Sequence, residues 1–188
     1  RRAELNLANT VFGGRYTSML NTALRVESGL TYGAWSSLRR YSSGGYLVIS
    51  SFTETSKTTQ AIDVALDLQA QLRNAGIDKE QIESARNYVM GQFPPRLETA
   101  SQLASQLAVL EQYQLDDAYI NGYPTALAQV DPDGIAEVVE EVYAAPGDMV
   151  FVLIGDAAAI RHEVSNYGPV TEVSIADPRF RFPAPPQQ

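Results

Sequence analysis

Two neighbouring stretches rich in β-branched and aromatic residues constrain the fold of this 188-residue chain most strongly. Residues 31–41 and 45–53 carry Thr, Tyr, Trp, Val and Ile, the residue types that favour strands. Ser42-Ser43-Gly44-Gly45 joins them with turn-forming residues, so the pattern predicts a β-hairpin. A hairpin is antiparallel and excludes an all-parallel sheet. Neither face of the second stretch is strongly polar, which predicts a strand in the interior of a sheet.

Helical periodicity dominates most of the remaining chain. The regular stripe from Ile135 to Tyr143 has the i, i+3, i+4, i+7, i+8 spacing of an amphipathic helix. Similar patterns and caps predict helices over residues 4–10, 18–28, 61–75, 79–93 and 157–166, another around Leu103 and Leu110, and strands over 149–154 and 170–175. This order predicts an α+β fold, a two-layer α/β sandwich with a mostly antiparallel sheet and helices packed on one face.

Composition excludes several classes of function. Asp and Glu number 22 against 14 Lys and Arg, a net charge of −8, so nucleic acid is not an expected partner. The absence of cysteine excludes disulfides and thiolate catalysis. No apolar run approaches the roughly 20 residues that span a bilayer. The longest run, residues 149–154, predicts a buried strand.

The two ends of the chain differ from its middle. The first residues, Arg1 to Leu5, have no signal-peptide apolar region and predict a boundary inside a longer protein. Residues 178–188 contain four prolines, a composition typical of an extended tail. We therefore expect one domain over residues 1–176 and a proline-rich tail over residues 177–188.

Common catalytic patterns are missing. His162 is the only histidine, and neither HExxH nor HxxEH occurs, so we expect no metal site in this chain. The same scarcity of imidazole excludes a Ser-His-Asp triad. Gly13-Gly14 lacks the Lys-Ser/Thr and the spacing of a phosphate loop.

One arrangement could still bind a substrate. Arg25 ends a predicted helix, Tyr32 begins a predicted strand, and Gly29 between them suits a left-handed turn that folds one toward the other. A guanidinium and a phenol that converge could bind a peptide carbonyl or the oxyanion formed when it is attacked. The alternative is structural: Arg25 would interact with its helix C-terminus, and Tyr32 would pack in the sheet.

Residues 9–32 also carry a family resemblance. Asn9-x-x-x-Gly13-Gly14, then Ser18-Met19-Leu20, then Leu24-Arg25-Val26-Glu27-Ser28-Gly29-Leu30-Thr31-Tyr32 resembles the signature of the C-terminal, non-zinc-binding domain of M16 (insulinase/pitrilysin-like) metallopeptidases. Gly44-Gly45 with the following apolar stretch, and Ile154-Gly155-Asp156, also fit. The resemblance covers residues 4–156. Met19 and Val26 replace the Arg and Glu of many members, and the family's preceding first strand is missing.

The resemblance implies an M16/LuxS-like metallohydrolase fold truncated at its N-terminal strand. It implies a zinc ion in a homologous HxxEH-bearing half or partner subunit and none in this fragment, which would be inactive alone. The two halves would enclose unfolded peptide in a chamber. Arg25 would hold a substrate backbone carbonyl, and Tyr32 would help stabilise the tetrahedral intermediate.

Two alternatives to the peptidase half remain open. A structural, catalytically inactive subunit of the same superfamily would keep the fold without a working peptide site. An unrelated α+β binding module is the other, and it would lack the hairpin. A homodimer of the isolated domain is a further possibility. By resemblance, a periplasmic location is favoured over a cytoplasmic one.

Overall fold

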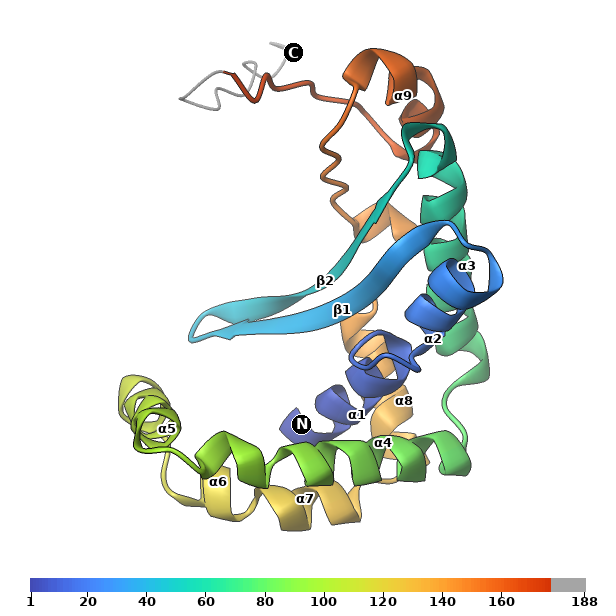
Figure 1. Cartoon of the computed structure of the whole chain (residues 1–188). Coiled ribbons are helices and arrows are strands. Elements are labelled where there is room, and N and C mark those ends of the chain that lie inside the picture. Colours follow the sequence, from blue (N-terminus) through green and yellow to red (C-terminus); the bar gives the residue numbers. More distant parts are fainter. Residues whose placement is uncertain (177–188) are drawn as a thin grey trace.

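The computed structural model describes residues 1–176 (Figure 1). Its strands are β1 (Thr31–Tyr41) and β2 (Gly44–Thr53). Its α-helices are α1 (Arg2–Phe12), α2 (Met19–Asn21), α3 (Thr58–Ala75), α4 (Lys79–Gln92), α5 (Ala100–Tyr113), α6 (Ala118–Asn121), α7 (Tyr123–Gln129), α8 (Pro132–Val142) and α9 (Ala157–Val164). Short π- or 3-10-helical turns are η1 (Thr22–Glu27), η2 (Thr55–Lys57), η3 (Pro94–Leu97), η4 (Pro146–Asp148) and η5 (Ser165–Tyr167). The predicted proline-rich tail lies outside the described residues.

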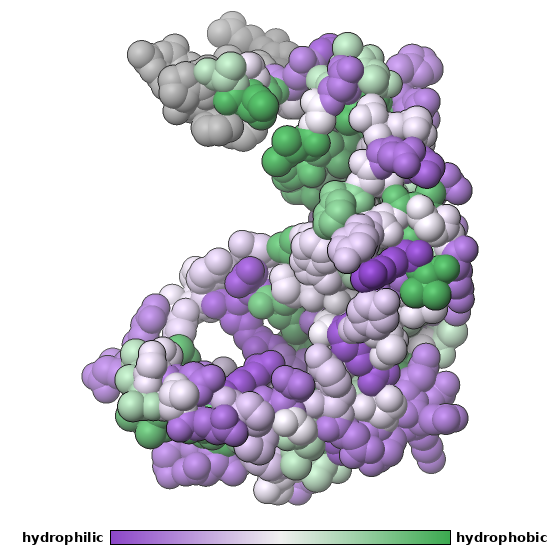
Figure 2. All heavy atoms as spheres, in the orientation of Figure 1, coloured by the Kyte–Doolittle hydropathy of each residue, from purple (hydrophilic) through white to green (hydrophobic). Residues whose placement is uncertain are grey.

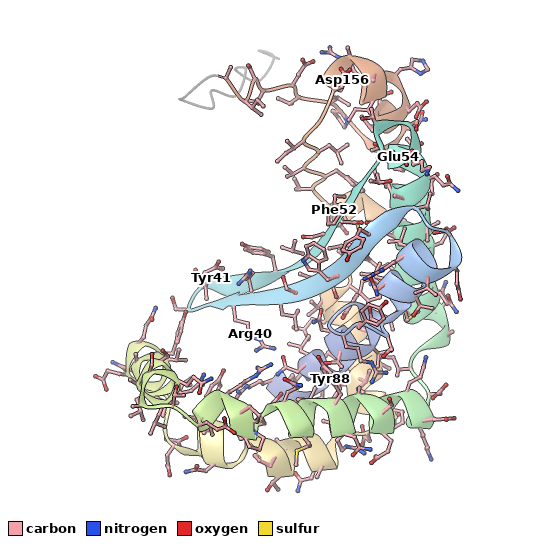
Figure 3. All side chains as sticks on the ribbon, in the orientation of Figure 1. Arg40, Tyr41, Phe52, Glu54, Tyr88 and Asp156 are labelled. Carbon is pink, nitrogen blue, oxygen red and sulfur yellow. The ribbon has the colours of Figure 1, made fainter. Side chains whose placement is uncertain are left out.

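The fold is α+β, as predicted. β1 and β2 form the expected antiparallel hairpin, and directly paired residues share a face. The inner face packs toward α1 and consists of Ala34, Ser36, Leu38, Arg40, Leu47, Ile49 and Ser51. The outer face consists of Trp35, Ser37, Arg39, Tyr41, Tyr46, Val48, Ser50 and Phe52. Figure 3 shows Tyr41 and Phe52 on the side away from α1, and Arg40 on the side facing it.

The core forms around α1. Leu7, Ala8, Val11 and Phe12 are buried on this helix, which packs against α4, α8 and the hairpin. The predicted stripe of α8 is confirmed, because Ile135, Val138 and Val139 are also buried in this core. Helices therefore cover one face of the hairpin and leave the outer face open.

The predicted helix boundaries rest on caps that the structure contains. Asp78 accepts a hydrogen bond from Gln81 N at 2.7 Å, and the Gln81 side chain accepts one from Asp78 N at 3.1 Å. This reciprocal pair is a capping box at the start of α4. The helix ends at Gln92, just before Pro94-Pro95, as predicted.

Tyr143 lies in the core with an unsatisfied hydroxyl. Its ring meets Phe12 edge-on at 5.2 Å between centroids, and its hydroxyl has no hydrogen-bond partner within the described residues. We predict that Tyr143→Phe raises the free energy of unfolding by about 1 kcal/mol, since it removes a buried group that lacks a partner. Urea unfolding measures this change, and a loss of stability in the Phe variant would contradict it.

The same burial raises the pKa of Tyr143 above the ordinary tyrosine value. The unfolded chain ionises first, so this tyrosine's contribution is complete below pH of about 10 and is lost as pH rises further. The Phe variant should lack this part of the alkaline loss of stability.

The prediction of a buried strand over residues 149–154 is wrong. This segment is extended but unpaired, and Val150, Val152 and Ile154 are 89%, 80% and 84% exposed. A strand needs a neighbouring ladder, and neither this segment nor the outer edge of β2 has one within residues 1–176. The prediction that β2 lies inside a sheet is wrong for the same reason. Residues 170–175 also form no strand.

The molecule has a concave side. Figure 2 shows it hollowed between the end carrying α9 and the β1–β2 hairpin, with hydrophobic atoms of residues 150–154 at the wall of the hollow. Within residues 1–176, no helix combines the length and apolarity that crossing a bilayer requires.

Candidate functional site

The Asn9 and Gly13-Gly14 positions fasten α1 to β1. The backbone N–H groups of Gly13 and Gly14 donate to Asn9 O at 2.9 and 2.7 Å. Ser36 N donates to Gly13 O at 2.9 Å, and Ser36 Oγ donates to Asn9 Oδ1 at 2.7 Å. A Cβ on Gly13 would lie 2.5 Å from Ser36 N, so only glycine allows this approach. The glycines therefore position β1 against the end of α1.

Asn21 fastens the next segment to the same strand. Its side chain is buried, donates to Tyr16 O at 2.8 Å and accepts from Ala34 N at 3.3 Å. One amide therefore links the loop that carries Tyr16 to β1. The sequence did not single out this residue, because an asparagine in a predicted helix carries no signal of a contact with a distant strand.

Arg25 lies on a π-helical turn. Ser18 caps α2, and the chain then widens into η1, where Ser28 N donates to Ala23 O at 3.0 Å. Gly29 has φ of +61°, which confirms the predicted left-handed cap, and Leu30 N returns to Leu24 O at 2.9 Å. π-Helical turns are rare and are frequent at functional sites.

A β-bulge sets the direction of Tyr32. Thr31 pairs with Thr53 and Ala34 with Ser51, so Tyr32 and Gly33 together lie opposite Phe52. The extra residue reverses the alternation, and Tyr32 lies on the outer side, 74% exposed. Thr31 Oγ1 accepts from Gly33 N at 3.0 Å, and Ser51 Oγ donates to Gly33 O at 3.1 Å. These two hydroxyls hold the bulge in place.

The structure brings Arg25 and Tyr32 together. The Arg25 Cζ lies 4.5 Å from the ring centroid of Tyr32 and 5.1 Å from that of Tyr16. Tyr16, which sequence reasoning missed, is 63% exposed. We call Tyr16, Arg25 and Tyr32 the arginine–tyrosine stack. No sequence pattern indicated that Tyr16 would contact Arg25. That contact depends on the path of the loop after Gly13-Gly14 and on the hydrogen bond from Asn21 to the loop.

The stack leaves hydrogen-bonding groups available. No side-chain hydrogen bond or ion pair of Arg25 occurs within residues 1–176, and its guanidinium contacts the rings of Tyr16 and Tyr32. Cation–π contact occupies the faces of a guanidinium, whereas its N–H donors lie in its plane. Tyr32 is exposed rather than packed in the sheet, so the structural alternative for this residue does not hold. The stack can therefore present donors to an oxygen of a bound molecule.

Metal ligands do not gather in this structure. Within residues 1–176, no group of three or more His, Cys, Asp or Glu side chains could hold a metal ion. His162 is exposed on α9, and its carbonyl accepts from Ser165 Oγ at 2.6 Å as part of a helix end.

Comparison with known families identifies the part of the chain that contains the stack. Residues 1–89 match the family model described as the peptidase M16 inactive domain. This part of the chain is a peptidase M16 inactive domain. The match includes the Asn9 and Gly13-Gly14 fastening, the arginine–tyrosine stack and the whole hairpin, so the resemblance seen in the sequence is confirmed.

Individual proteins of related sequence or structure are consistent with this family match. An uncharacterized zinc protease of Bacillus subtilis, YmxG, is 26% identical over 103 residues, which cover 55% of this chain and 25% of the relative. The solved structure of a peptidase M16 inactive domain from Pseudomonas fluorescens has a TM-score of 0.69 at 18% identity and covers 75% of this chain and 34% of its own. The inactive peptidase domain of a proposed zinc protease from Bordetella parapertussis has a TM-score of 0.64 at 14% identity. The match covers 76% of this chain and 77% of the Bordetella chain.

The structural matches cover about three quarters of this chain, so the likeness in fold extends beyond residue 89. The chain spans about a quarter of the length of the curated relative that it matches.

Proposed function

We propose that this chain is the non-metal-binding half of an M16 zinc peptidase and holds unfolded peptide in a chamber formed with an HxxEH-bearing half or subunit. The observation that carries the proposal is the arginine–tyrosine stack. It places the guanidinium of the half-buried Arg25, with unused donors, against the rings of two exposed tyrosines, within the residues that match the M16 inactive domain.

The geometry suits a peptide carbonyl. The Tyr16 and Tyr32 rings hold the plane of the Arg25 guanidinium, so its rotamer is ordered before a ligand arrives. Ordering in advance lowers the entropy lost on binding. In-plane N–H groups would then donate charge-assisted hydrogen bonds to a carbonyl oxygen, and the Tyr32 hydroxyl would serve as a second donor. Main-chain recognition of this kind depends little on peptide sequence.

Zinc would come from outside this chain. The described residues offer no set of ligands, and a curated relative is named a zinc protease. When bound in the partner half, the metal would activate water and polarise the scissile carbonyl. Arg25 and Tyr32 would bind and orient the peptide beside that metal.

Peptide binding tests this proposal. A fluorescently labelled unfolded peptide should bind the chain, and Arg25→Ala should weaken binding about ten-fold or more, since a hydrogen bond from a charged donor contributes about 1.5–3 kcal/mol. Fluorescence anisotropy measures both. Arg161→Ala is the matched control, because Arg161 is an exposed arginine on α9. Equal binding by wild type and Arg25→Ala would contradict the proposal, and no binding by either would favour the structural subunit.

A further inference from the structure

We propose that Trp35 and Phe52 form a binding site for one large apolar side chain of the peptide whose backbone Arg25 holds. This inference rests on the proposed function and adds a preference among peptides. It assigns a role to the outer face of the hairpin, which the described helices leave uncovered (Figure 3).

The bulge places this aromatic pair next to the stack. Tyr32 and Gly33 lie opposite Phe52, so Tyr32 shares the outer side with Phe52. Trp35 reaches back over the bulge, and its ring lies 3.7 Å from the position that a Cβ on Gly33 would take. The Trp35–Phe52 pair therefore lies on the same side of the hairpin as Tyr32 and next to it.

The pair itself forms an open apolar corner. The Trp35 and Phe52 rings meet edge to face, with centroids 6.2 Å apart at 65°. Trp35 is 46% exposed and Phe52 55% exposed, although aromatic residues of this size are usually well buried. Two tilted aromatic faces with solvent on the open side suit an aliphatic or aromatic side chain.

Spacing agrees with one extended peptide occupying both places. Tyr32 lies opposite Phe52 and Trp35 opposite Ser50, so at about 3.3 Å per residue they lie roughly 7 Å apart along the hairpin. An extended peptide covers this distance in about two residues. A carbonyl at Arg25 therefore places the side chain two or three residues away over the Trp35–Phe52 corner.

Tryptophan fluorescence reports on the Trp35–Phe52 corner alone, because Trp35 is the only tryptophan of the chain. The probe is a short Gly-Ser host peptide carrying a single Leu, moved through successive positions, with the all-Gly-Ser peptide as reference. At one or two positions, Leu should shift the Trp35 emission to shorter wavelength and tighten binding by about ten-fold, the amount that burial of a leucine side chain provides.

Two variants separate this inference from the proposed function. Phe52→Ala should abolish the advantage of the Leu peptide and leave binding of the reference peptide unchanged. Arg25→Ala should weaken both peptides equally and preserve their ratio. Val48→Ala, on the same outer face, is the control for a general loss of apolar surface.

The outcomes are distinct. A Leu advantage that persists in Phe52→Ala, or no Leu advantage at any position, would overturn the Trp35–Phe52 site while leaving the role of Arg25 intact. A Leu advantage with no effect of Arg25→Ala would overturn the proposed function alone. Trp35 emission that shifts with protein concentration without peptide, together with dimers in sedimentation, would assign this face to a second copy and overturn the site.

Discussion

Arg25→Ala is expected to lower kcat/KM for peptide hydrolysis by the complete zinc enzyme at least about ten-fold, and up to the 10²–10³ of a lost oxyanion donor. The guanidinium makes no hydrogen bond within the described chain, and the two rings that it contacts, Tyr16 and Tyr32, are exposed, so its removal should leave the fold intact and act on contacts with substrate. Steady-state kinetics on an unfolded peptide measures the change. Arg161→Ala again serves as the control and should retain wild-type rates.

Tyr32→Phe should separate binding from chemistry. The ring remains over the Arg25 guanidinium, and only the exposed hydroxyl is lost. A loss confined to kcat would assign the hydroxyl to the transition state, because such contacts do not change ground-state binding. Turnover at the wild-type rate in both Arg25→Ala and Tyr32→Phe would remove the catalytic role of the stack.

Gly13→Ala is expected to destabilise the fold by about 1–3 kcal/mol, the typical range for an added methyl group in a packed site. The new Cβ would lie 2.5 Å from the backbone N of Ser36 and 2.7 Å from a methyl carbon of Leu20. Because the first of these is main chain, α1 and β1 must move apart. Urea unfolding measures the change.

Gly91→Ala is the matched control for this substitution. Gly91 lies within α4 with no atom near its Cβ position, so alanine should stabilise the helix by about 0.5–1 kcal/mol. Gly13→Ala should also weaken peptide binding, since the same strand carries Tyr32. A fully stable Gly13→Ala variant would show that α1 and β1 are not held this closely.

The hairpin and most helices could be predicted from the sequence because their signals are local. β1 occupies the predicted residues, and the Asp78–Gln81 capping box and the Gly29 turn depend on residues a few positions apart. Residues 149–154 could not be predicted in this way. An apolar sequence predicts a buried strand only if another strand pairs with it. The sequence of these residues does not show whether such a neighbour is present, and here they are largely exposed.

The candidate site was predictable in part for a similar reason. The spacing around Gly29 brings Arg25 and Tyr32 near each other, but strict alternation along β1 would direct Tyr32 inward with Ala34. The bulge that turns it outward is a property of the pairing with β2. Asn21 holds the backbone of Tyr16 beside the stack, through a contact between side chain and main chain that no sequence spacing reveals.

Nuclear magnetic resonance of the chain with ¹⁵N-labelled arginine gives the most direct test of the central claim. On titration with an unfolded peptide, the Nε–H signal of Arg25 should shift together with the ring protons of Tyr32, with a single affinity, while the signal of Arg161 stays fixed. Saturable binding that leaves the Arg25 and Tyr32 signals unmoved would contradict peptide recognition by the arginine–tyrosine stack.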